Sequence, residues 1–597
     1  MTGDTPEGPD PTAPRDPGTE PAAGPDAAGT AALGSTAELA ELAELADDPG
    51  DADAASGTSG VIRNSAVMAS GTIVSRITGM VRDIVLVAAI GTGVFSDTYS
   101  VGNTLPNIIY ILLVGGALNA VFVPQLVRHM KDDPDGGEGY TNGLITLTGL
   151  ALLVIGAIAV VLAPWIVKLY GSPLWSDDDL GTATAFARYC LPQIFFYGLF
   201  TLYSQVLNAR GRFAAPMFAP IINNVVMIAT AVMFLVIVGT DPTTAGISAG
   251  ETALLGIGTT LGVAAQAAVL VPVMSRAGYR WRLRTDFRGY GLGKAGELAK
   301  WTIGLVLVNQ ASYLVITKLA VTANVLASEN DAISAGITSY QKAHLLFVLP
   351  HSIITVSIVT ALLPRMSRAA HAGRHDEVAD DVAGGMRLIA AMLVPAAVLF
   401  VLLGPSIGQL LYGYGSTSPE SAALIGVILS MFALGLAPFS LFYVLLRGFY
   451  SLEDTRVPFL VTVVLNVVNL AIAVPLFFAL PIDLRVPGLA LSYSIAYVIT
   501  LALTWWLLAR RLGGLQTPRT LLAVLRIALA AVAAGAVALA SLLGISAAVP
   551  DSPAGLVVRL AVSGVVFAAV YLVLAKALRV REVGDVLALV GSRLRRS

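Results

Sequence analysis

Three charged residues stand inside the first long apolar segment of this chain. The segment contains the sequence SRITGMVRD at residues 75–83, in which the charges are Arg76, Arg82 and Asp83. A charge at the centre of a bilayer costs roughly 2.5–3.5 kcal/mol on insertion scales, so it normally faces a cavity, a counter-ion or a ligand. Arg76 is expected about 20 Å from the cytoplasmic end of its helix, at about 1.5 Å per residue. It is therefore predicted to lie near the middle of the membrane.

These charges suit the binding of an anion. Two cations with one acid leave a surplus positive charge, and the planar guanidinium of arginine donates paired hydrogen bonds to a diphosphate. We expect Ser75, Arg76 and Arg82 to bind substrate, with Asp83 and Asp97 as ion-pair or gate residues. The alternative interpretation is an ion-pair cluster that holds helices together without a ligand.

The eighth apolar segment carries a further cation. It contains YQKAHLLFVLPHS, in which Lys342 and His344 are predicted at about the depth of the first segment's charges, with His351 further along. Lys342 either completes a cationic cavity that binds substrate or extends its ammonium toward water. For His344 the preferred interpretation is a side chain that reaches water or a backbone carbonyl.

A bend is predicted in the second segment. Asn107 follows Pro106, and Gly115 and Gly116 come shortly after. Proline removes a backbone donor and disturbs the interior of a helix. Such a bend serves either a gate or helix packing, and Asn107 is a candidate gate residue.

Composition places the elements that carry these residues in a membrane. Of 597 residues, 56% are hydrophobic and 13% are charged, and the mean hydropathy is +0.76. Fourteen apolar segments are centred near residues 77, 112, 154, 194, 226, 262, 310, 350, 396, 434, 467, 498, 533 and 567. Backbone groups in hydrocarbon need partners within their own segment, so each segment is predicted to be an α-helix. The expected fold is an all-α polytopic membrane protein with about 14 transmembrane helices.

Basic residues predict how these helices are oriented. Connections after even-numbered segments are basic, for example at Arg276, Arg280 and Arg282, whereas those after odd-numbered segments are acidic or neutral, as around Asp177. Basic loops remain on the cytoplasmic side of a membrane. We therefore expect a multi-pass protein of the cell inner (plasma) membrane with both termini in the cytoplasm.

The two ends of the chain differ from its middle. Residues 1–60 contain 13 acidic residues and one basic residue, with few residues that could build a core. We expect them to form a disordered acidic cytoplasmic tail. Residues 514–597 are expected to hold two additional transmembrane helices and a basic C-terminal end. The single cysteine, Cys190, lies in an apolar segment and is expected to serve packing.

An internal repeat divides the rest of the chain. Two pairs of motifs recur at spacings of 240 and 242 residues: VFVPQLVR at 121–128 with ALLPRMSR at 361–368, and Pro216 and Asn224 with Pro458 and Asn466. The repeat is six helices long. It predicts an N-terminal six-helix lobe at 61–285 and a C-terminal six-helix lobe at 286–513, with substrate between them near the midplane. Buried asparagines at repeat-related places more often join helices than bind substrate.

No catalytic motif stands out. The sequence has no nucleotide-binding glycine loop, HExxH, GxSxG or paired catalytic carboxylates at credible positions. We therefore expect no enzymatic activity, no cofactor and no metal site.

The sequence resembles the MurJ/MviN family of lipid II flippases, in the multidrug/oligosaccharidyl-lipid/polysaccharide exporter superfamily. The resemblance covers roughly residues 62–580. It is carried by SRITGMVRD at 75–83, SDTYSVGNTLPN at 96–107, GALNAVFVP at 116–124, LNARGRFAAP at 207–216 and SIVTALLPRMS at 357–367. It implies a V-shaped pair of lobes that alternates access and moves an undecaprenyl-diphosphate-linked disaccharide peptide to the outer leaflet. It also implies that Arg76, Arg82 and Asp97 occupy cavity or gate positions, and that the last two helices form a groove for the lipid tail.

The chain departs from this family's pattern at three places. Ile108, Ile109 and Tyr110 stand where many members carry basic residues, Gly115-Gly116-Ala117 replaces Glu-Gly-Ala, and Lys342-Ala343-His344-Leu345 replaces a segment with arginine. The departures imply a cavity with fewer arginines, in which Lys342 is a substitute.

Two alternative functions remain open at this point. A multidrug or polysaccharide-lipid exporter of the same superfamily would have an aromatic or acidic cavity. A membrane scaffold would use the acidic tail to recruit cell-wall synthesis or division proteins. The expected partners are thus lipid II and the lipid bilayer, with such proteins as further partners, and no nucleic acid.

Overall fold

The computed structural model of the protein describes residues 58–114, 129, 133–135, 137–284, 292–333, 335–546, 549 and 552–584. The predicted acidic tail lies outside these residues, except for 58–60 in the first turn of the first helix. Gly115, Gly116 and the motif at 121–128 also lie outside them. All regular elements of the described residues are helices.

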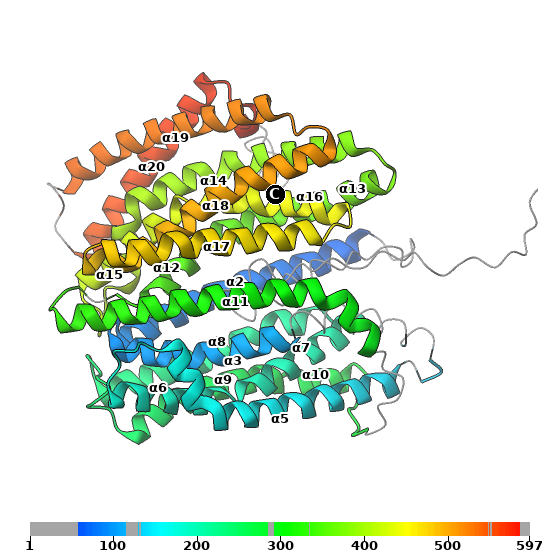
Figure 1. Ribbon diagram of the computed structural model, residues 1–597, viewed down its shortest axis with the longest axis vertical. Coiled ribbons are helices and arrows are strands. Elements are labelled where there is room, and N and C mark those ends of the chain that lie inside the picture. Colours follow the sequence, from blue (N-terminus) through cyan, green and yellow to red (C-terminus); the bar gives the residue numbers. More distant parts are fainter. Residues whose placement is uncertain are drawn as a thin grey trace, which may run out of the picture.

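The helices form two groups and an appended pair (Figure 1). The N-terminal helix group is α2 (Thr58–Ile90), α3 (Val94–Val114), α5 (Glu138–Tyr170), α6 (Asp177–Cys190), α7 (Gln193–Ala209), α8 (Ala214–Val238), α9 (Ala249–Ala268) and α10 (Leu270–Arg276). The C-terminal helix group is α11 (Leu292–Glu329), α12 (Ile337–Pro350), the π-helix η2 (His351–Thr355), α13 (Val356–His371), α14 (His375–Tyr412), α15 (Pro419–Ala433), α16 (Leu436–Ser451), α17 (Arg456–Ala479), the 3-10 helix η3 (Ile482–Leu484) and α18 (Arg485–Leu512). The appended pair is α19 (Thr517–Ser546) and α20 (Pro553–Ala577).

These helices have the length and composition of membrane spans. Eleven helices or helix runs of the described chain are long and apolar enough to cross a bilayer, and α15 with α16, bent by 46°, makes a twelfth. Helices α2 and α3 occupy the first two predicted segments. The predicted fold class, an all-α polytopic membrane protein, is confirmed.

The two groups repeat one pattern of helix contacts. Helix α2 packs on α8, and six spans later α11 packs on α17. In the same way α3 packs on α6 and α12 on α15, while α6 packs on α9 and α15 on α18. The breaks inside spans four and ten also correspond, because α6 ends at Cys190 and α15 ends at Ala433, 243 residues later. The repeat seen in the motifs thus extends to the packing of whole helices.

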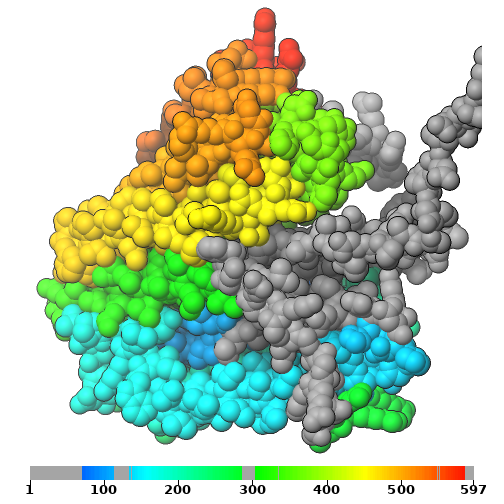
Figure 2. Space-filling model, turned by 45° about the vertical axis from the view of Figure 1, so that its right-hand side comes forward, coloured from blue at the N-terminus to red at the C-terminus, as the bar shows by residue number. Residues whose placement is uncertain are grey.

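Helix α11 lies at the boundary of the two groups. It contacts α3 and α5 on one side and α17 and α18 on the other. In the space-filling view its green surface lies between the cyan helices of the N-terminal group and the yellow helices of the C-terminal group (Figure 2). The appended helices α19 and α20 pack on each other and on α14. Their contact is built from alanines such as Ala390, Ala530 and Ala534, whose small side chains let helices approach closely.

Candidate functional site

A polar cavity of about 210 Å³ lies between the two helix groups. Helices α2, α3, α7, α8 and α9 line it from the N-terminal group, and α11 and α12 from the C-terminal group. Its charged lining residues are Arg82, Asp83 and Lys342. Its uncharged polar lining residues are Tyr99, Ser100, Asn103, Thr104, Asn107, Gln193, Tyr197, Asn223, Thr259, Gln310, Tyr313, Thr338 and Gln341. Eight apolar residues, among them Leu86, Ile108 and Met227, complete the lining. The cavity therefore offers a ligand many hydrogen-bonding groups beside an apolar wall.

The charged lining residues form one connected centre. Lys342 Nζ lies 2.6 Å from Asp83 Oδ1, and Arg82 Nη2 lies 3.3 Å from Asp83 Oδ2. Asp83 is buried, and burying a carboxylate is costly unless cations and hydrogen bonds compensate it. Two cations and one acid leave one positive charge in excess. The second cation beside Asp83 is Lys342, which comes from the opposite helix group.

A buried asparagine positions Arg82. Asn224 of α8 accepts a hydrogen bond from Arg82 Nη1 at 3.1 Å. The amide nitrogen of Asn224 donates to the Ser75 carbonyl oxygen at 3.2 Å and to Thr78 Oγ1 at 3.0 Å. The amide thus ties α8 to α2 and fixes the guanidinium at the cavity wall. The part that Ser75 takes in these bonds is its backbone carbonyl, and its expected role in substrate binding stays a prediction.

Asn466, the repeat partner of Asn224, makes the corresponding contact in the C-terminal group. Its amide nitrogen donates to Asn309 Oδ1 of α11 at 2.8 Å and to the Thr462 carbonyl at 2.9 Å. Each asparagine therefore joins the fifth span of its group to the first. Only Asn224 also holds a cation of the cavity.

Arg76 lies outside the residues that line the cavity. Its guanidinium donates to Ser352 Oγ in the π-helix η2. This bond crosses from α2 to the C-terminal helix group, as does the ion pair of Lys342. Of the two predicted arginines, the structure places Arg82 in the cavity and Arg76 at a separate contact between the groups.

Asp97, predicted as an ion-pair or gate residue, forms a buried contact between the groups with uncharged partners. It is 0% exposed, and its carboxylate accepts from Asn324 Nδ2 at 2.8 Å and from the Thr338 backbone nitrogen at 3.0 Å. A Cβ on Gly336 would overlap this carboxylate. Only glycine therefore allows the start of α12 to approach α3 so closely. The contact joins α3 to α11 and α12.

A loop of the C-terminal group also covers the end of α2. Ser416 donates from its backbone nitrogen to the Ala88 carbonyl at 2.8 Å, and its hydroxyl donates to the Ala89 carbonyl at 3.1 Å. Thr417 Oγ1 donates to the Val87 carbonyl at 3.2 Å. The last carbonyls of a helix have no partner within it, so these bonds act as a cap supplied by the other helix group. We call Ser416 and Thr417 with their three acceptors the α2 latch.

Several cavity residues escaped the sequence analysis. Gln193, Gln310 and Gln341 line the cavity, together with the tyrosines and Asn103. The only sign of the three glutamines in the sequence is a polar residue inside an apolar segment. Such a residue does not show which side of its helix faces the cavity. Asn107, predicted as a gate residue, lines the cavity from α3, the helix that contains Pro106. His344 lies away from the cavity, between the rings of Phe347 and Phe432.

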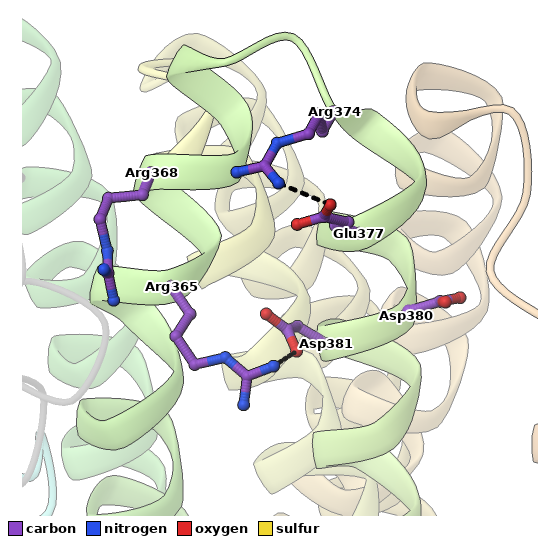
Figure 3. Close-up of a pocket in the computed structure, with 6 residues that line it drawn as sticks. All are labelled: Arg365, Arg368, Arg374, Glu377, Asp380 and Asp381. Carbon is purple, nitrogen blue, oxygen red and sulfur yellow. Dashed lines mark hydrogen bonds and ion pairs between the residues drawn. The ribbon is translucent and has the colours of Figure 1, made fainter.

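A second pocket lies at the junction of α13 and α14, lined by Arg365, Arg368, Arg374, Glu377, Asp380 and Asp381 (Figure 3). Arg365 pairs with Asp381 at 2.9 Å, and Arg374 pairs with Glu377 at 2.7 Å. Figure 3 shows that Arg368 and Asp380 point away from these pairs. With three bases and three acids the pocket has no excess charge, and exposed ion pairs contribute little free energy. Among the described residues, no three His, Cys, Asp or Glu side chains are placed to hold a metal ion.

The fold and the cavity define a class of protein, a polytopic membrane transporter built from two related helix groups. Similar folds occur in the solved structure "Lipid II flippase MurJ, inward closed conformation", with a TM-score of 0.67 at 17% identity over 86% of this chain and 99% of that chain. They also occur in an inward-facing MATE family transporter of the MOP superfamily, with a TM-score of 0.53 at 14% identity over 76% of this chain and 98% of that chain. At these identities the likeness shows the fold alone.

The chain belongs to the MurJ family, because the family model described as "Lipid II flippase MurJ" matches residues 86–551. A relative from Rhizobium tropici, named "Probable lipid II flippase MurJ", is 28% identical over 470 residues, 76% of this chain and 84% of its own. Another from Burkholderia cenocepacia, named "Lipid II flippase MurJ", is 26% identical over 405 residues, 65% of this chain and 72% of its own. The resemblance drawn from the sequence is confirmed.

Proposed function

We propose that this protein moves lipid II, the undecaprenyl-diphosphate-linked disaccharide peptide, from the inner to the outer leaflet of the cytoplasmic membrane by alternating access. The observation that carries this proposal is the polar cavity with an excess positive charge, enclosed between repeat-related helix groups of a MurJ family chain. An anionic headgroup would satisfy that charge, and hydroxyl and amide groups would meet the sugars and the peptide.

The diphosphate binds between Arg82 and Lys342. Both cations contact Asp83, at 3.3 Å and 2.6 Å. Arginine gives a phosphate a bidentate partner and lysine gives it a point charge, so together they suit a diphosphate. The remaining N–H groups of Arg82 and Lys342 can donate to the phosphate oxygens while Asp83 keeps its contacts with both cations. Arg76 acts at the contact with Ser352, and its release accompanies movement of the groups.

The moving bodies are the two predicted lobes, 61–285 and 286–513. With both termini in the cytoplasm, the α2 latch and the Asp97 contact lie toward the outer face. They hold that side closed while the cavity accepts substrate from the inner leaflet. Rocking of the lobes breaks these bonds and opens the cavity outward, as repeat-built transporters do around a central site. The appended helices α19 and α20 supply a surface for the lipid tail.

Binding of lipid II to the purified full-length protein tests the proposal. Native mass spectrometry in lipid nanodiscs would compare wild type with Arg82→Ala and Lys342→Ala, using Arg365→Gln from the surface pocket as a control. Each cavity variant should bind at least about tenfold more weakly, since a hydrogen bond to a charged group contributes about 1.5–3 kcal/mol. The control should bind as wild type does. Wild-type affinity in both cavity variants would reject this site.

A flipping assay tests transport itself. Fluorescent lipid II in proteoliposomes should become accessible to a membrane-impermeant quencher only when the protein is present. A multidrug exporter is not favoured, because the one acid among the described lining residues already pairs with two cations and does not suit a cationic drug. Flipping of a cationic dye with no effect on lipid II would reverse this conclusion.

A further inference from the structure

Buried polar atoms without hydrogen-bond partners follow one face of the eighth span. They are His344 Nε2, His351 Nε2 and Thr355 Oγ1, whose residues are 6%, 1% and 0% exposed. Positions 344, 351 and 355 share a helix face, and the cavity residue Lys342 lies on the opposite side of the helix. A buried polar atom left without a partner costs about 1–3 kcal/mol, so three on one face call for a function.

The surroundings of His351 are aromatic and buried. Its ring centroid lies 4.4 Å from that of Phe439 and 5.1 Å from that of Tyr443, and its Nδ1 is 2.9 Å from Ser440 Oγ. With Nδ1 donating to Ser440, the lone pair of Nε2 is free to accept a proton. His344, about two turns earlier on the same face, lies against Phe347, Phe432 and Tyr493.

No acidic side chain is bonded to either histidine in the part of the chain that the structure describes. The described titratable and charged groups on the elements that pack around them are Tyr340 and Lys342 of α12, Tyr443, Arg447 and Tyr450 of α16, Arg485, Tyr493, Tyr497, Arg510 and Arg511 of α18, Tyr313, Lys318 and Glu329 of α11, Asp97, Tyr99 and Tyr110 of α3, and Glu420 of α15. Helix α13 has Arg365, Arg368 and His371 near its C-terminal end, and α14 has His375, Asp376, Glu377, Asp380, Asp381 and Arg387 near its start and Tyr412 at its end. Arg447 lies over the ring of Tyr443 at 4.4 Å and competes with a protonated His351 for it. In this conformation the neutral imidazole is therefore the favoured form.

The backbone at His351 is itself unusual. His351–Thr355 forms a π-helical turn between α12 and α13. Single π-turns inside α-helices are frequent at functional sites. The next residue, Ser352, accepts the hydrogen bond from Arg76, and Lys342 on the same helix pairs with Asp83. A change of charge or hydration at His351 would therefore act on both contacts that tie this span to α2.

We propose that His351, supported by His344, is a proton-binding site that couples a proton gradient to the movement of the two helix groups. This inference rests on the proposed flippase function. The proton is taken up on Nε2 in a conformation that hydrates the ring, and is released when the ring returns to its aromatic surroundings. Histidine changes charge near neutral pH, as such a site requires. Protonation is more favourable in the conformation that hydrates the ring. A lower pH therefore shifts the population toward that conformation and away from the one described here.

Nitrogen NMR of the full-length protein tests proton binding without any transport. The chain has only five histidines, His129, His344, His351, His371 and His375, so ¹⁵N-histidine spectra in nanodiscs can be assigned by comparison with His351→Gln. The signal lost in that variant should change from the neutral to the cationic pattern between pH 8 and pH 5. A signal that stays neutral over this range, with and without lipid II, would overturn the proposal.

Flipping under an imposed gradient tests coupling. For wild type, a difference of one pH unit across the proteoliposome membrane should change the flipping rate by up to about tenfold, the change in occupancy of one weakly occupied site. The control His375→Gln, at the exposed start of α14, should respond in the same way. His351→Gln should bind lipid II with wild-type affinity. Its rate of lipid II flipping should not depend on the pH gradient. A response retained in His351→Gln, or absent from wild type, would overturn the coupling. Absence of lipid II binding by wild type would instead contradict the proposed function, and the NMR titration would still decide whether His351 binds a proton.

Discussion

The ammonium of Lys342 lies 2.6 Å from the carboxylate of Asp83, and the two residues belong to different helix groups. Asp83 also accepts from Arg82 at 3.3 Å, so one buried carboxylate holds a cation from each side of the cavity. The pair is therefore both part of the binding centre and a bond between the moving groups. Its two roles can be separated by mutation.

Lys342→Met should lower both the stability and the affinity for lipid II. The methionine keeps the length of the side chain but leaves Asp83 with only Arg82, at a cost of about 1.5–3 kcal/mol for a lost charged hydrogen bond. Thermal unfolding in detergent and binding by native mass spectrometry measure the two effects. The double variant Lys342→Met with Asp83→Asn should recover part of the stability, because the side chain that lost its lysine is no longer charged, while Arg82 keeps its bond to Asn224. It should still bind weakly. Recovery of affinity in the double variant would show that Lys342 serves only to neutralise Asp83.

Gly415→Ala should weaken the α2 latch. Gly415 has a φ of +60°, and a Cβ there would overlap the Ala88 carbonyl oxygen that Ser416 caps. The matched control is Gly211→Ala, because Gly211 has a φ of +69° with no heavy atom within 4 Å of an added Cβ. Both variants carry the backbone strain of an alanine at positive φ, of about 1–2 kcal/mol, and only one also meets a clash.

Accessibility of the cavity measures the latch. A cysteine placed at Ser100 in a Cys190→Ser background should react with a membrane-impermeant thiol reagent several-fold faster in Gly415→Ala than in Gly211→Ala. The reason is that the outward-open conformation gains population when the closed one is destabilised. Equal labelling rates in the two variants would show that the latch does not control access.

Asp97→Ala should open the same side by a different route. The change removes the acceptor of the Asn324 amide and of the Thr338 backbone nitrogen, and leaves buried donors without partners at about 1–3 kcal/mol each. The cysteine-labelling assay should show faster reaction, and thermal unfolding should occur at a lower temperature. Asp97→Asn keeps one acceptor oxygen and should lie between wild type and Asp97→Ala. A labelling rate that follows charge alone, with Asp97→Asn as fast as Asp97→Ala, would argue against a hydrogen-bonded closure.

Most of the fold could be predicted from the sequence because the bilayer imposes one solution. A run of about 20 apolar residues in hydrocarbon must be helical, and recurring prolines and asparagines set the repeat. The matching contacts of α2 with α8 and of α11 with α17 agree with that repeat. Arg82, Asp83 and Lys342 could be selected by depth alone, since a charge deep in an apolar helix is expensive wherever it points.

The partners of these residues could not be predicted, because they depend on how the two groups pack. The sequence predicted both Arg76 and Arg82 to line the cavity. Arg76 instead donates a hydrogen bond to Ser352, which is 276 residues later in the sequence. Asp97 was predicted as an ion-pair or gate residue, but its partners, the Asn324 amide and the Thr338 backbone nitrogen, carry no charge. Ser416 and Thr417 stand in a loop with no distinctive pattern, and their function as a cap for α2 arises only from the approach of Gly415.

The repeat offers a matched pair that separates binding from folding. Asn224 and Asn466 occupy corresponding places, and each joins the fifth span of its group to the first. Only Asn224 accepts from Arg82 Nη1, at 3.1 Å. Asn224→Leu and Asn466→Leu should both lower the unfolding temperature, because each removes buried hydrogen bonds and leaves donors or acceptors unpaired. Asn224→Leu should in addition bind lipid II about tenfold more weakly, since Arg82 loses the group that orients it. If Asn466→Leu lost affinity to the same extent, the loss would come from loosened helices, and Asn224 would have no special part in placing the guanidinium.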